Sequence, residues 1–123
     1  MESASSHADV VLVGGGLANG LIALRLKSLR PALRVVLLEQ GPRIGGEHTW
    51  CHFATDVDAA IAGSLRRLIV HRWSGYEVRF PGHARQLSTD YLAITSERLH
   101  QVVTDTLGAD AWLGASVSDV ASA

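Results

Sequence analysis

Residues 9–46 read DVVLVGGGLANGLIALRLKSLRPALRVVLLEQGPRIGG, and this stretch decides the fold. Val10–Val13 is an aliphatic run too short for a buried helix, so it predicts a strand buried on both faces. Three glycines, residues 14–16, follow at once, and Leu17–Leu29 then has the alanine and leucine content of a helix. A second apolar run completes the series. This order of elements is what binding an adenine dinucleotide requires.

The glycine turn has a direct chemical use. Without Cβ atoms the backbone of Gly14, Gly15 and Gly16 can bend tightly and let a pyrophosphate approach, while the first N–H groups of the following helix point at the anion. The last glycine of the motif is Gly20, one place later than in G-x-G-x-x-G, because Asn19 occupies the usual third position. The match is therefore to the looser form G-x-G-x-x-x-G.

The second apolar run, residues 34–38, predicts a strand that ends at Glu39, about 20 residues after the last glycine. A carboxylate there is placed to accept a hydrogen bond from an unphosphorylated adenosine ribose. Arg43, Gly45 and Gly46 come next, and nicotinamide dehydrogenases do not need such a segment. In flavoproteins with this kind of opening an arginine and a glycine pair lie along the dinucleotide, so the sequence favours FAD over NAD.

Composition narrows the classes of protein. The chain has 123 residues, of which 47% are hydrophobic and 19% charged, with a formal net charge of -1. This length suits one domain with a modest core and is too short for a complete flavoenzyme. The charge balance argues against a nucleic-acid partner. No stretch approaches the roughly 20 apolar residues of a membrane span, and a single cysteine fits a reducing cytoplasm. Residues 1–8 predict a flexible polar leader.

Residues 47–53 concentrate ring-bearing side chains, and we expect a loop beside the cofactor there. Trp50 and Phe53 are expected to be buried. His48, Cys51 and His52 suggest a metal site, but a structural zinc normally needs four ligands and no second Cys or His pair stands at a suitable spacing, so we predict no metal.

The remaining segments predict short elements. Residues 56–67 have the spacing of a helix, and residues 68–73 and Tyr76–Phe80 predict a β-hairpin around Ser74 and Gly75 that ends at Pro81 and Gly82. Tyr76, Val78 and Phe80 should line one face of that hairpin. Residues 92–94 predict a strand, Thr95 or Ser96 a cap, and residues 97–107 a helix with Arg98 in its first turn. Residues 111–114 and 117–120 predict two last strands, after which the chain stops as if truncated.

With these residues in view, the chain resembles the bacterial lycopene β-cyclases of carotenoid biosynthesis. Four segments carry the resemblance in the family's order: VLVGGGLANGLIALRL, LLEQGPRIGGEHTW, HRWSGYEVRFPG and YLAITSERL. Together they cover nearly the whole chain from Asp9 onward. Glu47 stands where a neutral amide is expected, and Cys51 stands where a serine is common.

The resemblance implies an α/β fold: the N-terminal part, residues 9–123, of a Rossmann-like FAD/NAD(P)-binding domain related to flavin monooxygenases, with an inserted β-hairpin. It implies pyrophosphate binding at the glycine turn, ribose binding at Glu39, a second glycine motif at Arg43 and Gly46, and an arginine, Arg98, that reaches the cofactor. The complete set of expected cofactor-binding residues is Gly14, Gly15, Gly16, Leu17, Ala18, Gly20, Glu39, Gln40, Arg43, Gly46 and Arg98.

The chemistry implied by the family is cyclisation without net oxidation. A terminal double bond of lycopene is protonated, an internal double bond closes a six-membered ring, and a proton leaves. The implied cofactors are reduced FAD and NADPH or NADH as its reductant, and the implied partners are linear carotenoids and a membrane surface, for a cytoplasmic protein peripheral to the membrane. The acid that donates the proton is not identified in residues 1–123, where Glu47 is the nearest carboxyl to consider. Two alternatives stay open: an FAD-dependent monooxygenase or oxidoreductase, and an inactive nucleotide-binding fragment.

Overall fold

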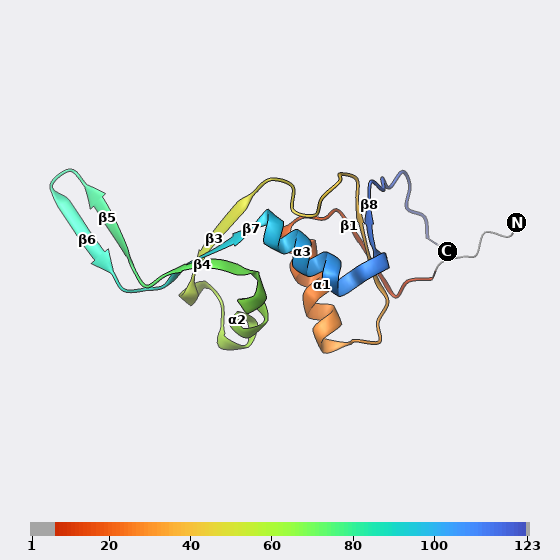
Figure 1. Cartoon of the computed structure of the whole chain (residues 1–123), viewed down its shortest axis with the longest axis horizontal. Coiled ribbons are helices and arrows are strands. Elements are labelled where there is room, and N and C mark those ends of the chain that lie inside the picture. Colours follow the sequence, from red (N-terminus) through yellow and green to blue (C-terminus); the bar gives the residue numbers. More distant parts are fainter. Residues whose placement is uncertain (1–6, 123) are drawn as a thin grey trace, which may run out of the picture. The chain divides into compact units, whose positions relative to one another are not determined.

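The computed structural model describes residues 7–122, which divide into two compact units (Figure 1). The first unit comprises the described residues up to Gly46 together with those from Leu99 onward, and the second comprises residues 47–98. Most of the predicted leader, residues 1–6, lies outside the described residues. His7, which belongs to the same predicted leader, accepts a hydrogen bond at its carbonyl from Arg34 Nη1 at 2.7 Å.

The first unit is built on a parallel sheet in the order β1-β2-β8. β1 spans Val10–Val13, β2 spans Val35–Glu39 and β8 spans Ala111–Leu113. Val10 pairs with Val35 and Glu39 pairs with Leu113, so β2 is central, and Val35, Val36 and Leu37 are almost completely buried. The unit is therefore α/β, as the sequence predicts.

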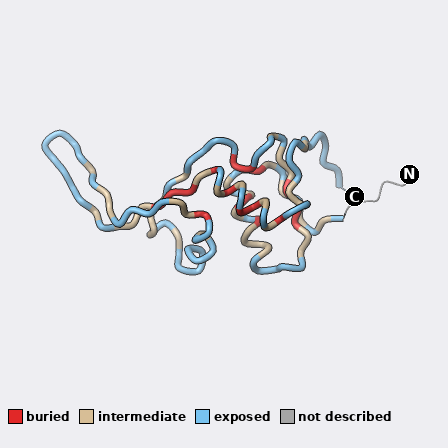
Figure 2. The backbone as a smooth tube through the Cα atoms, viewed as in Figure 1, coloured by how far each residue is buried: buried red, intermediate tan, exposed pale blue. Residues whose placement is uncertain are grey.

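Two helices belong to the first unit wholly or in part. α1 spans Leu17–Leu29, and α3 spans Ser96–Leu107, with its residues from Leu99 onward in this unit; the short helix η3, Gly108–Asp110, leads into β8. Buried hydrophobic residues of α1 and α3 join those of β2 in the core, along the red stretches of Figure 2. They are Ala23, Leu99, Val102, Val103 and Leu107.

The predicted burial of β1 on both faces is wrong. Val11 is 52% exposed and Val13 is 55% exposed. Val11 and Val13 are alternate residues of β1 and point to the same face, so this face is open among the described residues. β1 also pairs with β2 alone there and is an edge strand. The strand predicted at residues 117–120 is absent, because this segment joins no ladder and Val120 is 82% exposed.

The second unit contains an antiparallel sheet in the order β3-β7-β4. β3 spans Thr49–Phe53, β7 spans Tyr91–Thr95 and β4 spans Ile69–Trp73. Between β3 and β4 lie η1 (Ala54–Asp56), α2 (Ala59–Leu65) and η2 (Arg66–Leu68). Leu68, Leu92, Ala93 and Ile94 form the small buried core of this unit.

The loop predicted at residues 47–53 is largely a strand. β3 pairs along its whole length with β7, from Thr49 opposite Thr95 to Phe53 opposite Tyr91. Trp50 and Phe53 are half-buried rather than buried. The partner strand lies about 40 residues later, so the local pattern of TWCHF contained no sign of it.

The predicted hairpin around Ser74 and Gly75 is also wrong, although both of its strands exist. β4 pairs with β7, whereas β5 (Tyr76–Phe80) pairs with β6 (His83–Leu87), and β6 was not predicted. The turn of the β5–β6 hairpin is Pro81 and Gly82, with Gly82 at a φ of +75°, an arrangement that a type II turn favours. This ribbon is drawn separately from the β3-β7-β4 sheet in Figure 1.

Candidate nucleotide-binding site

The glycine turn lies at the carboxyl end of β1. Gly14 has a φ of +95°, which L side chains rarely adopt, and its N–H donates to the Leu38 carbonyl at 2.7 Å. The chain thus turns away from the sheet immediately after β1. The absence of a Cβ at Gly14 is what allows this backbone conformation.

Asn19 holds the turn from within α1. Its Nδ2 donates to the carbonyl of Val13 at 2.9 Å and to that of Gly14 at 2.8 Å. Sequence analysis treated Asn19 only as a departure from the tighter glycine spacing. Its amide in place of the usual third glycine was the available signal, since a side chain there can reach back to the turn.

The beginning of α1 is suited to an anion. Gly16 is the N-cap, no side chain caps the helix, and no acidic residue lies in its first turn. A Cβ built on Gly16 would meet no atom within 4 Å, so open space adjoins the first helical N–H groups. Unsatisfied N–H groups and the positive end of the helix dipole favour a phosphate at such a position.

Glu39 is fixed at the carboxyl end of β2 by two backbone donors. Its Oε2 accepts from the Gly15 N–H at 2.6 Å, and its Oε1 accepts from the Gly41 N–H at 2.8 Å. A Cβ on Gly15 would lie 2.8 Å from Glu39 Oε2, so only glycine permits this approach. Because a carboxylate has about four lone-pair sites, both oxygens retain capacity for ribose hydroxyls.

The second glycine segment is brought to the first. The Gly45 N–H donates to the Gly15 carbonyl at 2.7 Å, and Gly45 and Gly46 have φ values of +85° and +59°. Ile44 is completely buried, and its N–H donates to His100 Nδ1 at 3.0 Å. His100 is a contact that sequence analysis missed, because its partner lies 56 residues away.

The other predicted residues of this unit take different places. Gly20 is buried one turn into α1, where a Cβ would lie 3.1 Å from Leu99 Cδ1, so its small size permits close helix packing. Its predicted contact with pyrophosphate stays a prediction. Leu17 is half-buried at the beginning of α1, and the remaining three, Ala18, Gln40 and Arg43, are exposed.

Arg98 belongs to the second unit and is described there. Its N–H donates to Thr95 Oγ1 at 3.3 Å, which identifies Thr95 as a cap of α3, and its Nη1 donates to the Arg67 carbonyl at 3.2 Å. Its predicted contact with the cofactor stays a prediction. Ser96 has another role, since its Oγ accepts from the His48 N–H at 3.2 Å.

No metal centre is found among residues 7–122, where no three His, Cys, Asp or Glu side chains are placed to share an ion. Cys51 and His52 are neighbours in β3 and therefore lie on opposite faces of the sheet. A catalytic acid is likewise not assigned, and Glu47, the carboxyl considered from the sequence, is exposed.

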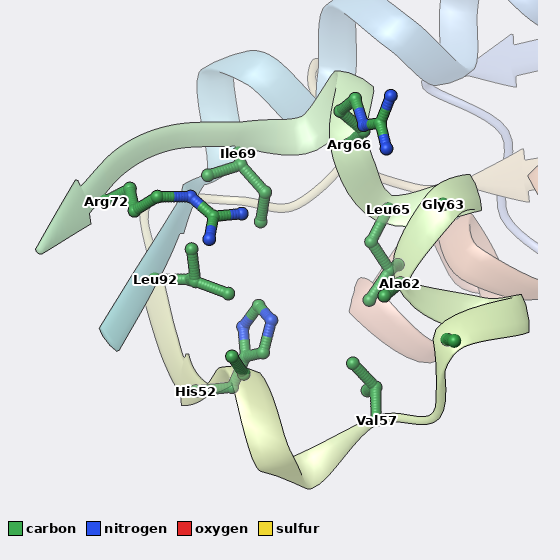
Figure 3. Close-up of a pocket in the computed structure, with 11 residues that line it drawn as sticks. His52, Val57, Ala62, Gly63, Leu65, Arg66, Ile69, Arg72 and Leu92 are labelled. Atoms are coloured by element: carbon green, nitrogen blue, oxygen red, sulfur yellow. The ribbon is translucent and has the colours of Figure 1, made fainter. Parts of the chain in front are cut away.

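A cavity of about 300 Å³ lies in the second unit between α2 and one face of the β3-β7-β4 sheet (Figure 3). His52, Leu92 and Arg72 reach it from the three strands, and Arg72 Nη1 contacts Asp90 Oδ2 at 2.6 Å. The rest of its lining is mostly small or aliphatic: Ala54, Val57, Ala59, Ala62, Gly63, Leu65, Arg66 and Ile69.

The fold resembles that of a solved structure. The peptidyl tryptophan dihydroxylase QhpG, essential for tryptophylquinone cofactor biogenesis, superposes with a TM-score of 0.51 at 17% identity, over 88% of this chain and 25% of that one. The match shows a shared fold. The glycine turn and Glu39 lie at the carboxyl ends of the adjacent parallel strands β1 and β2. This α/β arrangement is typical of Rossmann-like nucleotide-binding domains.

The chain belongs to the lycopene cyclase protein family, whose model matches residues 9–123. It is 46% identical over 112 residues to the lycopene beta-cyclase of Pseudescherichia vulneris, covering 91% of this chain and 29% of that protein. It is 41% identical over 114 residues to the lycopene beta-cyclase of Pantoea ananas, covering 93% of this chain and 30% of that protein. The chain thus spans less than a third of the length of these relatives.

Proposed function

We propose that this chain is the N-terminal, cofactor-binding portion of a lycopene beta-cyclase that converts the linear ends of lycopene to β-ionone rings. The family match over residues 9–123 carries this proposal, since it includes both the glycine turn and the whole second unit. Relatives that bear the name lycopene beta-cyclase are similar over more than nine tenths of the chain. The portion that would complete the enzyme corresponds to the rest of their length.

FAD fits the residues of the first unit. The uncapped beginning of α1 would receive the pyrophosphate beside Gly16, where open space adjoins the helix. Glu39 would accept from the adenosine ribose with a carboxylate already oriented by two N–H donors. Arg43 is exposed and lies two residues before Gly45, whose N–H contacts the glycine turn. Its guanidinium would meet the negative charge of the dinucleotide. FAD carries the unphosphorylated adenosine ribose that a carboxylate favours.

When bound, a reduced flavin supplies electron density that stabilises a nearby carbocation or assists proton transfer. NADPH or NADH would keep it reduced. The residues of this chain contribute the binding and orientation of the nucleotide half. The acid that protonates lycopene belongs, in this proposal, to the later portion of the enzyme.

We infer a peripheral association with the membrane, because lycopene dissolves in lipid rather than in water. Among the described residues no helix combines the length and apolar character needed to cross a bilayer. The measurement is flotation of the full-length protein with lipid vesicles. Recovery of all protein in the lipid-free fraction would contradict this part of the proposal.

The decisive experiment is expression of the full-length protein in cells that accumulate lycopene, followed by chromatography of the pigments. We expect β-carotene in cells with the wild-type protein and unchanged lycopene in cells with a Gly15→Val variant, whose side chain would collide with Glu39. An oxygenated or desaturated product would favour the monooxygenase or oxidoreductase alternative. Unchanged lycopene with a flavin-loaded wild-type protein would contradict the cyclase proposal.

A further inference from the structure

Four aromatic side chains gather on one face of the β3-β7-β4 sheet. The register places Phe53 of β3 and Trp73 of β4 directly opposite Tyr91 of the central strand. The ring centroids of Phe53 and Tyr91 are 5.0 Å apart, and those of Trp73 and Tyr91 are 5.8 Å apart. Tyr76 of β5 joins the group, with its ring 5.0 Å from that of Phe53. We call these four residues the aromatic row.

The sheet face that bears the aromatic row has no formal charge among its strand residues. Residues that alternate with or lie opposite the row share this face. They are Thr49 and Cys51 of β3, Ala93 and Thr95 of β7, and His71 of β4. No Lys, Arg, Asp or Glu side chain of the three strands is among them. A solvated sheet face normally carries charged residues, so this composition indicates an apolar occupant.

The two faces of the sheet differ in what covers them. The opposite face carries Leu92 and Arg72 and is covered by α2 across the 300 Å³ cavity (Figure 3). On the aromatic face, within the second unit as described, Cys51 and His71 are exposed and Trp73 is 47% exposed. Trp73 is therefore available to a ligand, while Phe53 and Tyr91 are half-buried around it.

We propose that the aromatic row is the wall against which one end of the linear carotenoid lies, and that its rings stabilise the carbocation formed there. This inference rests on the proposed function. The match is one of charge: a hydrocarbon offers no partner for a charged group, and the strand residues of this face include no Lys, Arg, Asp or Glu. Across three strands the row spans roughly 10 Å, which suits the end of a polyene rather than its whole length.

The aromatic rings add a chemical effect to the apolar contact. Protonation of the terminal C=C gives a tertiary cation; the π electrons of an internal C=C then form the new C–C bond, and loss of a proton from a neighbouring C–H restores a double bond. One proton enters and one leaves, so no oxidant or reductant is consumed. The negative face of an aromatic ring attracts a cation, most strongly for Trp. Trp73 is consequently the residue expected to matter most for the rate.

The test is a series of site-specifically fluorinated tryptophans at Trp73 in the full-length enzyme. Fluorine withdraws electron density from the ring and changes its size little, so folding is preserved while cation stabilisation is reduced. We expect log kcat to fall steadily with the number of fluorines, to a total loss of about 5- to 30-fold, with KM for lycopene little changed. The same series at Trp112, which is 42% exposed in β8 of the first unit, is the matched control and should leave kcat unchanged.

Each outcome separates this inference from the proposed function. An active wild-type enzyme whose kcat does not respond to fluorination at Trp73 would overturn the inference and leave the cyclase proposal intact. A wild-type enzyme that does not cyclise lycopene would contradict the cyclase proposal itself. A ligand-free full-length enzyme in which acrylamide cannot quench Trp73 fluorescence would also overturn the inference, because a later segment of the polypeptide would then cover the row.

Discussion

Single glycines determine whether the first unit can accept a nucleotide, and Gly16 offers the cleanest test. Its backbone is extended, with φ −80° and ψ −179°, so alanine fits the conformation, and the added methyl group meets no protein atom. We expect Gly16→Ala to cost at most about 1 kcal/mol of folding free energy. The methyl group would occupy the space assigned to the pyrophosphate and weaken FAD binding at least about 10-fold.

Flavin fluorescence titration of the full-length apoprotein measures this change. Gly63→Ala is the matched control, since Gly63 lies in α2 and its Cβ would also meet nothing within 4 Å. FAD affinity should be unchanged in that variant. Equal FAD affinity in Gly16→Ala and wild type would place the pyrophosphate elsewhere.

A second prediction at the residue scale concerns Tyr91. A hydrogen bond with Cys51, followed by burial and the charge of the Cys51 thiolate, raises the pKa of Tyr91. The folded protein therefore keeps this phenolic proton at pH values where the unfolded chain has lost it. The resulting stabilisation is complete below about pH 10 and is lost as pH rises through the folded-state pKa.

Cys51→Ala should move the pKa of Tyr91 downward, toward its ordinary value, and reduce the loss of stability that occurs as pH rises from about 10 through the folded-state pKa. Tyrosine ring-carbon NMR of the full-length protein measures the pKa, with Tyr91→Phe to assign the signal. A Tyr91 titration curve that is identical in Cys51→Ala and wild type would show that the thiol has no influence.

At the scale of elements, the sequence predicts the helices and strands whose formation depends on local interactions. Leu17–Leu29 is helical over the predicted residues because its alanine and leucine content favours a helix. Tyr76–Phe80 is a strand over the predicted residues because its side chains alternate, and each element begins directly after a glycine. Pairing was not predictable in the same way. β3 takes its partner from a strand about 40 residues later, so its own sequence predicts a loop.

The candidate site likewise combines features that the local sequence predicts with contacts between distant segments that it does not predict. The glycine turn and Glu39 stand out in the sequence because each needs a particular residue at a particular spacing. The contacts that hold the second glycine segment from outside it, such as that of His100 with Ile44, depend on how α3 packs in the first unit and leave no local trace in the sequence. Asn19 lies between these two cases. The altered glycine spacing at Asn19 is visible in the sequence, but its two hydrogen bonds to the turn are not.

The link between β4 and β5 gives a prediction at this scale. A Cβ on Gly75 would lie 2.6 Å from the backbone oxygen of Leu87, which cannot move without disturbing β6. We expect Gly75→Ala to destabilise the protein by about 1–3 kcal/mol, as overpacking does. Gly63→Ala should instead stabilise α2 by about 0.5–1 kcal/mol, because glycine is a poor residue in a helix interior.

Urea unfolding of the full-length variants, with a fluorescence probe in the second unit, gives both values. The opposite signs are the informative result, because both changes add one methyl group to a glycine. A Gly75→Ala variant as stable as wild type would mean that the ribbon β5–β6 does not hold Leu87 against Gly75.

At the scale of the whole molecule, the proposed reaction makes a prediction that does not depend on where the acid lies. Ring closure adds one solvent-derived proton to each lycopene end and removes a different hydrogen from carbon. In deuterated water each ring should therefore keep one deuterium, so that β-carotene with two rings is heavier by two mass units than the product from ordinary water. The reductant should not be consumed in proportion to the rings formed, because the substrate undergoes no net change in oxidation state. Mass spectrometry of the product, with NADPH absorbance followed under anaerobic conditions, checks both parts together. Product without deuterium, or one NADPH oxidised for every ring, would mean that closure does not proceed through protonation, and the cation-stabilising role of Trp73 would then have no cation to act on.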